Sequence, residues 1–140
     1  MIKDLIYQLK NIYRFSKIPY KDRDIVFFSE GKNYFYVFKK YIDIFINNKK
    51  IIFITQDRED PIFSYASENL KIIYCKNIYL LIIFMNNIKC KNLIMTMPDL
   101  NNYELKKSRN VKNYIYFFHS LVSTHMIYRF TKHIYEKIIF

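Results

Sequence analysis

The N-terminal segment combines apolar residues at helical spacing with basic residues at the positions between them. The apolar positions are Ile2, Leu5, Ile6, Leu9, Ile12 and Tyr13. The basic positions are Lys3, Lys10, Arg14 and Lys17. Because apolar residues three and four apart fall on one face of a helix, this pattern predicts an amphipathic basic helix over Ile2–Lys17. Pro19 disfavours helix at the residue before it, so the helix should end there.

Two interpretations of this helix stay open. The commoner arrangement is that the apolar face packs on the helix's own domain. The other is that the helix lies on an anionic membrane surface, with its apolar face in the interface. We assign residues 1–20 to this helix and residues 21–140 to one domain.

The rest of the chain alternates short apolar runs with segments of helical spacing. The predicted strands are Ile25–Ser29, Ile51–Thr55, Leu70–Tyr74, Asn92–Thr96, Asn113–Phe118 and Lys137–Phe140. The predicted helices are Tyr34–Asn48, a short helix within Pro61–Asn69, Ile78–Ile88 and a helical stretch around Ser123–His133. Continuous apolar runs that alternate with helices are typical of parallel strands in βαβ units. The sequence therefore predicts an α/β fold: a Rossmann-like, mostly parallel sheet of about six strands with helices on both faces.

Open sheets of this class bind ligands in the crevice beyond the carboxyl ends of their strands. This rule selects the loops that follow the predicted strands as the places to look for chemistry. These loops are Ser29–Asn33, Gln56–Pro61, Cys75–Asn77, Met97–Asn102 and His119–Ser123.

Composition agrees with a globular domain and narrows the range of partners. Hydrophobic residues make up 51% of the chain, and 23 basic residues against 12 acidic ones give a formal net charge of +11. This balance favours a phosphorylated substrate, anionic lipid or nucleic acid, unless the lysines only solvate the surface. The basic residues are dispersed and form no nucleic-acid-binding motif, so we expect no nucleic acid partner.

Cysteine usage and hydropathy indicate a cytoplasmic chain. Cys75 and Cys90 lie in or beside apolar segments without CxxC spacing, which predicts buried free thiols in a reducing compartment. The longest apolar run, Ile78–Met85, is far shorter than the roughly 20 residues of a spanning helix. No secretory signal is visible, because charged residues interrupt the apolar N-terminus. Peripheral binding to the inner face of the membrane stays an open alternative.

The segment Ser29-Glu30-Gly31 follows the first predicted strand and precedes a predicted helix. Gly31 is the only glycine in the chain. It therefore marks a place where the backbone turns sharply or where a ligand comes close. Free N–H groups at the start of the next helix would favour a phosphate. The other interpretation is a turn alone, and the remaining glycines of a GxGxxG dinucleotide motif are absent.

Two further loops at strand ends have mainly structural interpretations. Gln56–Pro61 is acidic, but its spacing sets up no metal site, and a solvated turn with Asp60 at the start of a short helix is the simpler account. In the loop after the fourth predicted strand, Pro98 and Asp99 are turn formers. We therefore expect no metal and no cofactor.

The loop after the fifth predicted strand holds the strongest candidate for chemistry, His119. A neutral imidazole at the end of a central strand faces the crevice and can take a proton from a hydroxyl nucleophile. Ser123 or Thr124 can cap the next helix, whose free N–H groups would face an anion. The other interpretation of His119 is a structural, hydrogen-bonded histidine. His125 is a weaker candidate of the same kind.

Three segments at these strand ends together resemble bacterial proteins similar to CDP-glycerol glycerophosphotransferases. The matching segments are Ile25–Tyr34, Met95–Leu100 and Phe117–Arg129, and the resemblance extends from about Asp24 to Arg129. It implies a GT-B architecture, in which two Rossmann-like domains have the active site between them. Members of the family transfer a polyol phosphate from a CDP-linked donor to a wall or surface polymer, such as teichoic acid, at the inner membrane face.

The resemblance also implies roles for individual residues. His119 matches a family histidine that follows a strand, and its implied role is general base on the acceptor hydroxyl. The residues expected to contact substrate are Ser29, Glu30, Gly31, Pro98, Asp99, Ser120, Ser123, Thr124 and His125. Ser120 stands where teichoic acid polymerases usually have glycine, so the identity of the substrate stays open.

The 140 residues end within the predicted sixth strand, and the family's second domain, which carries the nucleotide site, is not among them. We therefore expect an acceptor-side, N-terminal domain that has no transfer activity alone. Its acceptor would be a polymer or lipid-linked glycan, and a CDP-linked donor would bind only with a second domain. The alternative function is a non-enzymatic basic α/β module that binds anionic lipid or phosphorylated polymer.

Overall fold

The computed structural model of the chain describes residues 1–97, 100, 104–117 and 137–139. A six-stranded sheet lies at its centre, with the strand order β3-β2-β1-β4-β5-β6. Each neighbouring pair of strands is parallel. This is the order of a doubly wound sheet, in which the chain reverses its direction of growth between β1 and β4. The predicted Rossmann-like α/β fold is confirmed.

Most elements form at or near their predicted positions. The strands are β1 (Ile25–Ser29), β2 (Ile51–Thr55), β3 (Leu70–Tyr74), β4 (Cys90–Met95), β5 (Val111–Phe117) and β6 (Lys137–Ile139). The α-helices are α1 (Ile2–Lys17), α2 (Phe35–Phe45) and α3 (Ile78–Asn87). Three short 3-10 helices are η1 (Tyr20–Asp22), η2 (Lys32–Tyr34) and η3 (Pro61–Ser64). The predicted helix Ser123–His133 lies outside the described residues.

Strands β4 and β5 begin earlier than predicted, because their first residues alternate between buried and exposed instead of forming an apolar run. Cys90 is buried and Lys91 is exposed at the start of β4, and Cys90 pairs with Val111 of β5. Asn92 and Asn113 are also neighbours in this pairing, and the Asn113 amide donates to the Asn92 side-chain oxygen at 2.8 Å. This bond pairs two polar side chains that lie side by side in β4 and β5.

Helix α2 begins one residue after the start of the predicted Tyr34–Asn48 and ends three residues before its end. The short helix predicted within Pro61–Asn69 is confirmed as η3. After η3, the Ser67 hydroxyl accepts the Asn69 N–H at 3.2 Å and the Ser67 carbonyl accepts the Leu70 N–H at 3.2 Å. Such local bonds offer the backbone an alternative to a helix.

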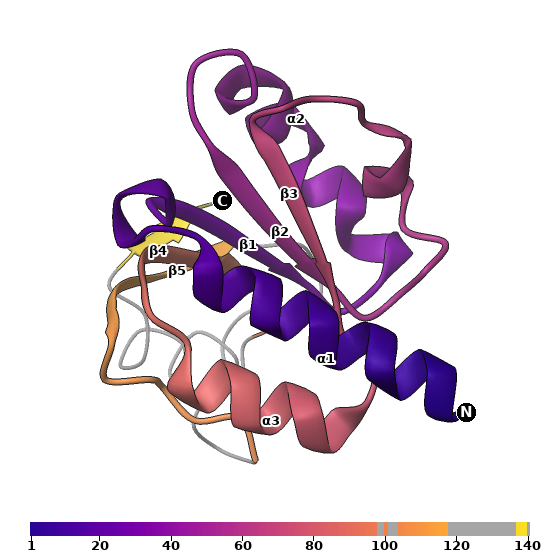
Figure 1. Ribbon diagram of the computed structural model, residues 1–140. Helices are drawn as coiled ribbons and strands as arrows, with labels where there is room; N and C mark the ends of the chain where they lie inside the picture. Colours follow the sequence, from indigo (N-terminus) through magenta and orange to yellow (C-terminus); the bar gives the residue numbers. More distant parts are fainter. Residues whose placement is uncertain (98–99, 101–103, 118–136, 140) are drawn as a thin grey trace.

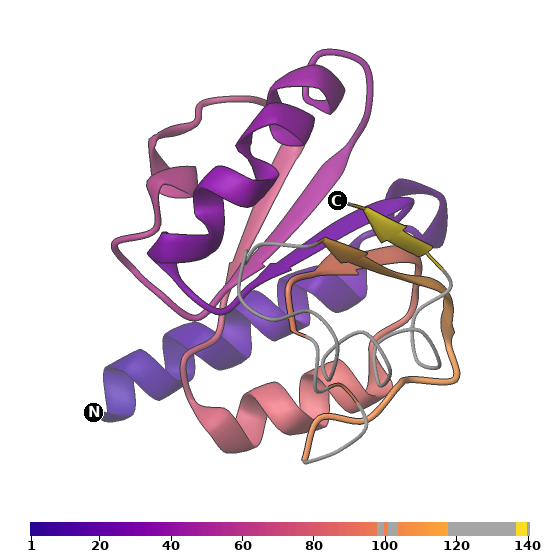
Figure 2. The same cartoon turned by 180° about the vertical axis from the view of Figure 1, so that it is seen from behind.

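Helices cover both faces of the sheet, as predicted (Figures 1 and 2). Helices α1 and α3 lie on one face, whereas α2 and η3 lie on the other. Successive side chains of β1 point to opposite faces of the sheet, so this strand contributes residues to the core on each face. Val26 and Phe28 belong to the core beneath α1 and α3, and Phe27 belongs to the core beneath α2.

The core beneath α2 is built largely from aromatic rings. The ring centroid of Phe38 in α2 lies 5.3 Å from that of Phe27, 6.0 Å from that of Phe53 and 5.7 Å from that of Phe117. Phe38 has no exposed surface. A single side chain of α2 therefore joins strands β1, β2 and β5.

Helix α1 packs on its own domain, but most of the predicted apolar positions lie outside the packed face, whereas Ile12 packs against the core. Its buried residues are Gln8, Asn11 and Phe15. The Gln8 side-chain oxygen accepts the backbone N–H groups of Lys76 and Asn77 at 2.8 and 2.7 Å. The predicted apolar positions that stay exposed are Ile2, Leu5, Ile6, Leu9 and Tyr13. Hydrogen bonding to the loop before α3 thus decides which face of α1 turns inward.

The substitution Phe38→Ala tests the aromatic core. Loss of the ring leaves a cavity against three strands, and we expect the free energy of unfolding to fall by about 3–5 kcal/mol. The matched control is Tyr36→Ala on the same helix, because Tyr36 is 73% exposed and its loss should change stability by no more than about 0.5 kcal/mol. Urea unfolding followed by circular dichroism measures both. Equal destabilisation by the two substitutions would contradict this assignment of the core.

Candidate functional site

The loop after β1 makes a turn that its own serine holds. The Ser29 hydroxyl is buried, donates to the Gly31 carbonyl at 2.9 Å and accepts the Gly31 N–H at 3.3 Å. Gly31 has φ 159° and ψ 177°, an extended conformation with positive φ that is essentially reserved for glycine. This conformation explains why a glycine stands at this position, and η2 begins immediately after it.

A carboxylate of the chain itself occupies the start of η2. The Lys32 N–H donates to one Asp57 carboxylate oxygen at 3.3 Å, and the Glu59 N–H donates to the other at 2.9 Å. The Glu59 N–H is the main cause that holds the pKa of Asp57 below its usual value, and Lys32 adds to it. The Lys32 ammonium also pairs with the Glu59 carboxylate. The anion at the start of η2 is thus the Asp57 carboxylate. The contacts of Lys32 with Asp57 and Glu59 join the loop after β1 to the loop after β2.

Asp60 is a buried residue that holds the loop after β2 through two hydrogen bonds. Its side chain is only 2% exposed, accepts the Thr55 hydroxyl at 2.8 Å and caps η3 by accepting the Ile62 N–H at 3.1 Å. Burial is the main cause that raises the pKa of Asp60, and these hydrogen bonds oppose the rise. The predicted cap is confirmed, but Asp60 is buried where a solvated turn was expected.

An open cavity of about 550 Å³ lies among these loops at the carboxyl edge of the sheet. The residues that line it are Glu30, Gln56, Asp57, Arg58, Glu59, Tyr74 and Lys76. Next to it, a hollow of about 210 Å³ is lined by Tyr7, Arg58, Phe63 and Tyr74. Carboxylates that can accept hydroxyl groups and cations that can bind phosphate thus lie around one cavity.

Arg58 is held in place from several sides. Its guanidinium lies 4.9 Å from the ring centroid of Tyr74 and 5.3 Å from that of Tyr7. It also pairs with Asp4 of α1. Such stacking fixes the planar guanidinium, which suits it to recognise a phosphate or carboxylate at the cavity rim.

The end of β4 adds a second feature at the same edge. Phe28 of β1 pairs with Met95 of β4, so Ser29 and Thr96 follow these residues side by side at the switch point of the sheet. Thr96 is fully buried, and its hydroxyl has no hydrogen-bond partner among the residues that the structure describes. An unpaired buried hydroxyl at a switch point is a group that a ligand could satisfy.

The structure describes only some of the predicted site residues. It brings Ser29, Glu30 and Gly31 to the carboxyl edge, where Glu30 lines the cavity. His119 follows the last residue of β5 by two positions in the sequence. The predicted site residues that lie outside the described residues are Pro98, Asp99, His119, Ser120, Ser123, Thr124 and His125.

Sequence reasoning missed the cations of this edge. Lys32, Arg58 and Lys76 each lie within a few residues after β1, β2 or β3, and that position was the available signal. A search restricted to histidines, hydroxyls and clustered acids does not select these cations. They come close together only because the three strands pair in the sheet, and no local sequence pattern encodes that pairing.

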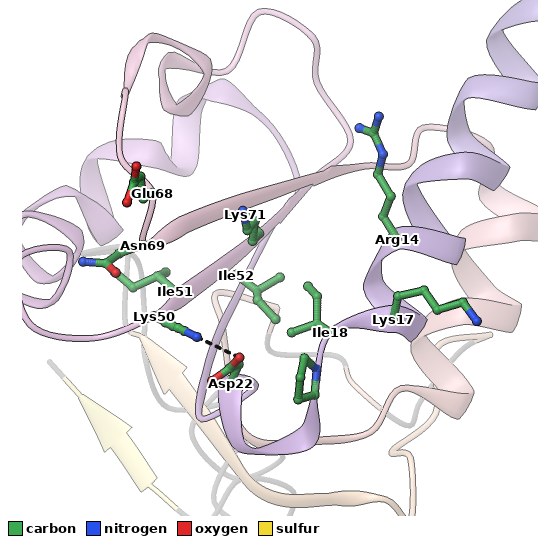
Figure 3. Close-up of a pocket in the computed structure, with 11 residues that line it drawn as sticks. Arg14, Lys17, Ile18, Asp22, Lys50, Ile51, Ile52, Glu68, Asn69 and Lys71 are labelled. Atoms are coloured by element: carbon green, nitrogen blue, oxygen red, sulfur yellow. Dashed lines mark hydrogen bonds and ion pairs between the residues drawn. The ribbon is translucent and has the colours of Figure 1, made fainter.

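A separate cavity of about 360 Å³ lies at the amino edge of the sheet, between the end of α1 and strands β2 and β3 (Figure 3). Its apolar lining includes Ile18, Ile51 and Ile52. An ion pair of 2.9 Å between Lys50 and Asp22 crosses its rim. Open α/β sheets bind ligands at the opposite edge, so we place the candidate site at the carboxyl edge.

The two cysteines take no part in either cavity. Both are buried free thiols, as predicted. Burial raises the pKa of Cys75 to about 11 and that of Cys90 to about 12, so neither forms a thiolate nucleophile near neutral pH.

No family model, curated protein or solved structure matches this chain. Among the described residues, no group of three or more histidine, cysteine or acidic side chains is arranged to hold a metal ion. The described helices also include none with the length and apolar character needed to cross a membrane.

The opposite pKa directions of Asp60 and Asp57 predict opposite pH effects on stability. A raised pKa in the folded state means that stability falls as pH rises from the unfolded value, roughly 3.9, through the folded one. The stability of the wild type relative to Asp60→Asn should therefore decrease as pH rises through this range. For Asp57, whose pKa is lowered, stability is lost as pH falls through the folded value, so stability relative to Asp57→Asn should increase with pH.

Urea unfolding of the three proteins at a series of pH values between roughly 3 and 7 measures these differences. Asp57→Asn serves as the matched control, because it lies on the same loop. The same pH dependence for both substitutions would contradict the burial assigned to Asp60.

Proposed function

We propose that this chain is the acceptor-side domain of a glycerophosphotransferase-like enzyme that builds a cell-surface polymer at the inner membrane face. One observation carries the proposal. Of the three segments of the family resemblance, Ile25–Ser29, Met95 and Phe117 lie in β1, β4 and β5, and these strands are consecutive neighbours in the sheet. The carboxyl ends of these three strands lie at one edge, where open α/β sheets bind ligands.

The cavity at this edge has the chemistry that a polyol phosphate acceptor needs. Glu59 and Asp57 offer carboxylate oxygens to hydroxyl groups, whereas Arg58 and Lys76 offer positive charge to a phosphate. A site for a nucleobase would instead be expected to offer a mostly apolar slot. The mixed lining therefore supports an acceptor-side role.

In the proposed reaction, His119 takes the proton of an acceptor hydroxyl. The acceptor oxygen forms a new bond to the phosphorus that carries the polyol. The bond between that phosphorus and the cytidylate of the donor breaks, and cytidine monophosphate leaves with the electron pair. The acceptor is thereby extended by one polyol phosphate, and His119 returns its proton to solvent.

Binding of a synthetic glycerol phosphate oligomer tests the acceptor-side role. We expect the amide resonances of Ser29, Asp57 and Thr96 to shift in titrations of the isotope-labelled chain, because these residues surround the carboxyl edge. Lys76→Ala should weaken binding about tenfold through the loss of one charge-assisted contact. The matched control is Lys71→Ala, which removes a lysine from the amino-edge cavity and should leave the affinity unchanged. Shifts confined to the amino edge would contradict the proposal.

The role of His119 needs a transfer assay. With CDP-glycerol and a donor-binding domain supplied in trans, we expect His119→Ala to lower the transfer rate by about 10²–10⁴ while oligomer binding persists. Transfer at the rate of the unsubstituted chain would rule out a general base at this position.

A further inference from the structure

Helix α1 carries an exposed apolar stripe along its whole length. Ile2, Ile6, Leu9 and Tyr13 follow the spacing of one helical face and are between 46% and 71% exposed. The buried positions Gln8, Asn11 and Phe15 fall on the opposite side. The stripe therefore points away from the sheet and contributes nothing to the core.

A basic stripe runs directly beside the apolar one. Its members are Lys3, Lys10, Arg14 and Lys17. Because one residue advances about 100° around a helix, Lys3, Lys10 and Arg14 each lie one step round from an apolar neighbour. The acidic residue of α1, Asp4, lies away from the basic stripe. Its carboxylate accepts the Gln8 side-chain amide at 2.7 Å and pairs with Arg58. No carboxylate of α1 thus competes with the basic stripe.

Helix α3 extends the apolar surface. It lies on the same face of the sheet as α1, and the rings of Phe15 and Phe84 fix the two helices to each other, with centroids 5.1 Å apart. Tyr79 and Ile83 of α3 are 76% and 64% exposed. The sequence of α3 contains no charged residue. We call the exposed residues of both helices, Ile2, Ile6, Leu9, Tyr13, Tyr79 and Ile83, the outer helix face.

We propose that the outer helix face docks this chain on a lipid bilayer that contains anionic phospholipid. In this arrangement α1 lies in the plane of the interface, with its apolar stripe in the headgroup and acyl boundary and its basic stripe at the phosphates. Charge complementarity selects this occupant. A second copy of the chain that packed through the same face would bring two basic stripes together. The inference does not depend on the proposed transferase role.

Tryptophan substitutions can report docking directly, because the chain contains no tryptophan. In Tyr13→Trp we expect the fluorescence to shift to shorter wavelength when phosphatidylcholine vesicles with phosphatidylglycerol are added. The matched control is Tyr36→Trp on α2, at the opposite face of the sheet, which should show no shift. A shift for both reporters, or for neither, would overturn the proposed orientation.

Vesicle flotation separates the two components of the surface. We expect the chain to float with vesicles that contain phosphatidylglycerol, to float less as salt rises, and to stay unbound with pure phosphatidylcholine. The double substitution Lys10→Glu/Arg14→Glu and the double substitution Ile6→Gln/Leu9→Gln should each weaken binding at least tenfold. Their matched controls, Lys40→Glu/Lys49→Glu and Tyr36→Gln/Ile44→Gln, change the same number of exposed residues in or just after α2 and should leave binding within about twofold.

Several results would overturn the proposal. Equal binding to neutral and anionic vesicles would remove the role of the basic stripe. Equal weakening by Lys40→Glu/Lys49→Glu would show attraction by net charge alone. Concentration-dependent dimerisation that Ile6→Gln/Leu9→Gln abolishes, without vesicle binding, would assign the face to a second copy. Vesicle binding should persist in Lys76→Ala, so failure of the acceptor site and failure of the lipid face are distinguishable.

Discussion

Strand β1 pairs with β2 on one side and with β4 on the other, and its residues Val26, Phe27 and Phe28 have no exposed surface. Parallel neighbours require crossover connections, and a strand buried on both faces requires a layer of helices above and below it. The positions of α1 and α3 on one face and of α2 on the other follow from this requirement. The carboxyl ends of β1, β4 and β5 consequently meet at one edge, and every feature of the candidate site lies there or beside it.

The carboxyl edge is organised by charges of the chain itself. Asp57 bonds the N–H groups of Lys32 and Glu59, and Asp60 joins β2 to η3 from a buried position. These side-chain contacts fix the loops after β1 and β2, which contain a single glycine between them. The cavity is therefore preorganised, which lowers the entropic cost of binding a ligand.

The packing of α1 shows how a polar contact can override a hydrophobic pattern. Gln8 is 3% exposed, and its side-chain oxygen is satisfied by the backbone N–H groups of Lys76 and Asn77 in the loop before α3. Phe15 supplies the apolar part of the same contact through Phe84. With this side turned inward, the apolar stripe and its basic neighbour face outward. One helix thus closes the sheet and presents the outer helix face to the surroundings.

The sequence by itself determined the local elements. The bounds of α1 and β1–β3 coincide with the predictions, because periodicity in helices and continuous apolar runs in doubly buried strands are local signals. The position of Ser29 at the end of β1, with Glu30 and Gly31 directly after it, was predicted in the same way. Only the tertiary structure decided that Arg58 and Lys76 border one cavity, that Asp60 is buried and that α1 packs through Gln8. These outcomes depend on backbone hydrogen bonds and burial between residues far apart in the chain, and no local spacing carries that information.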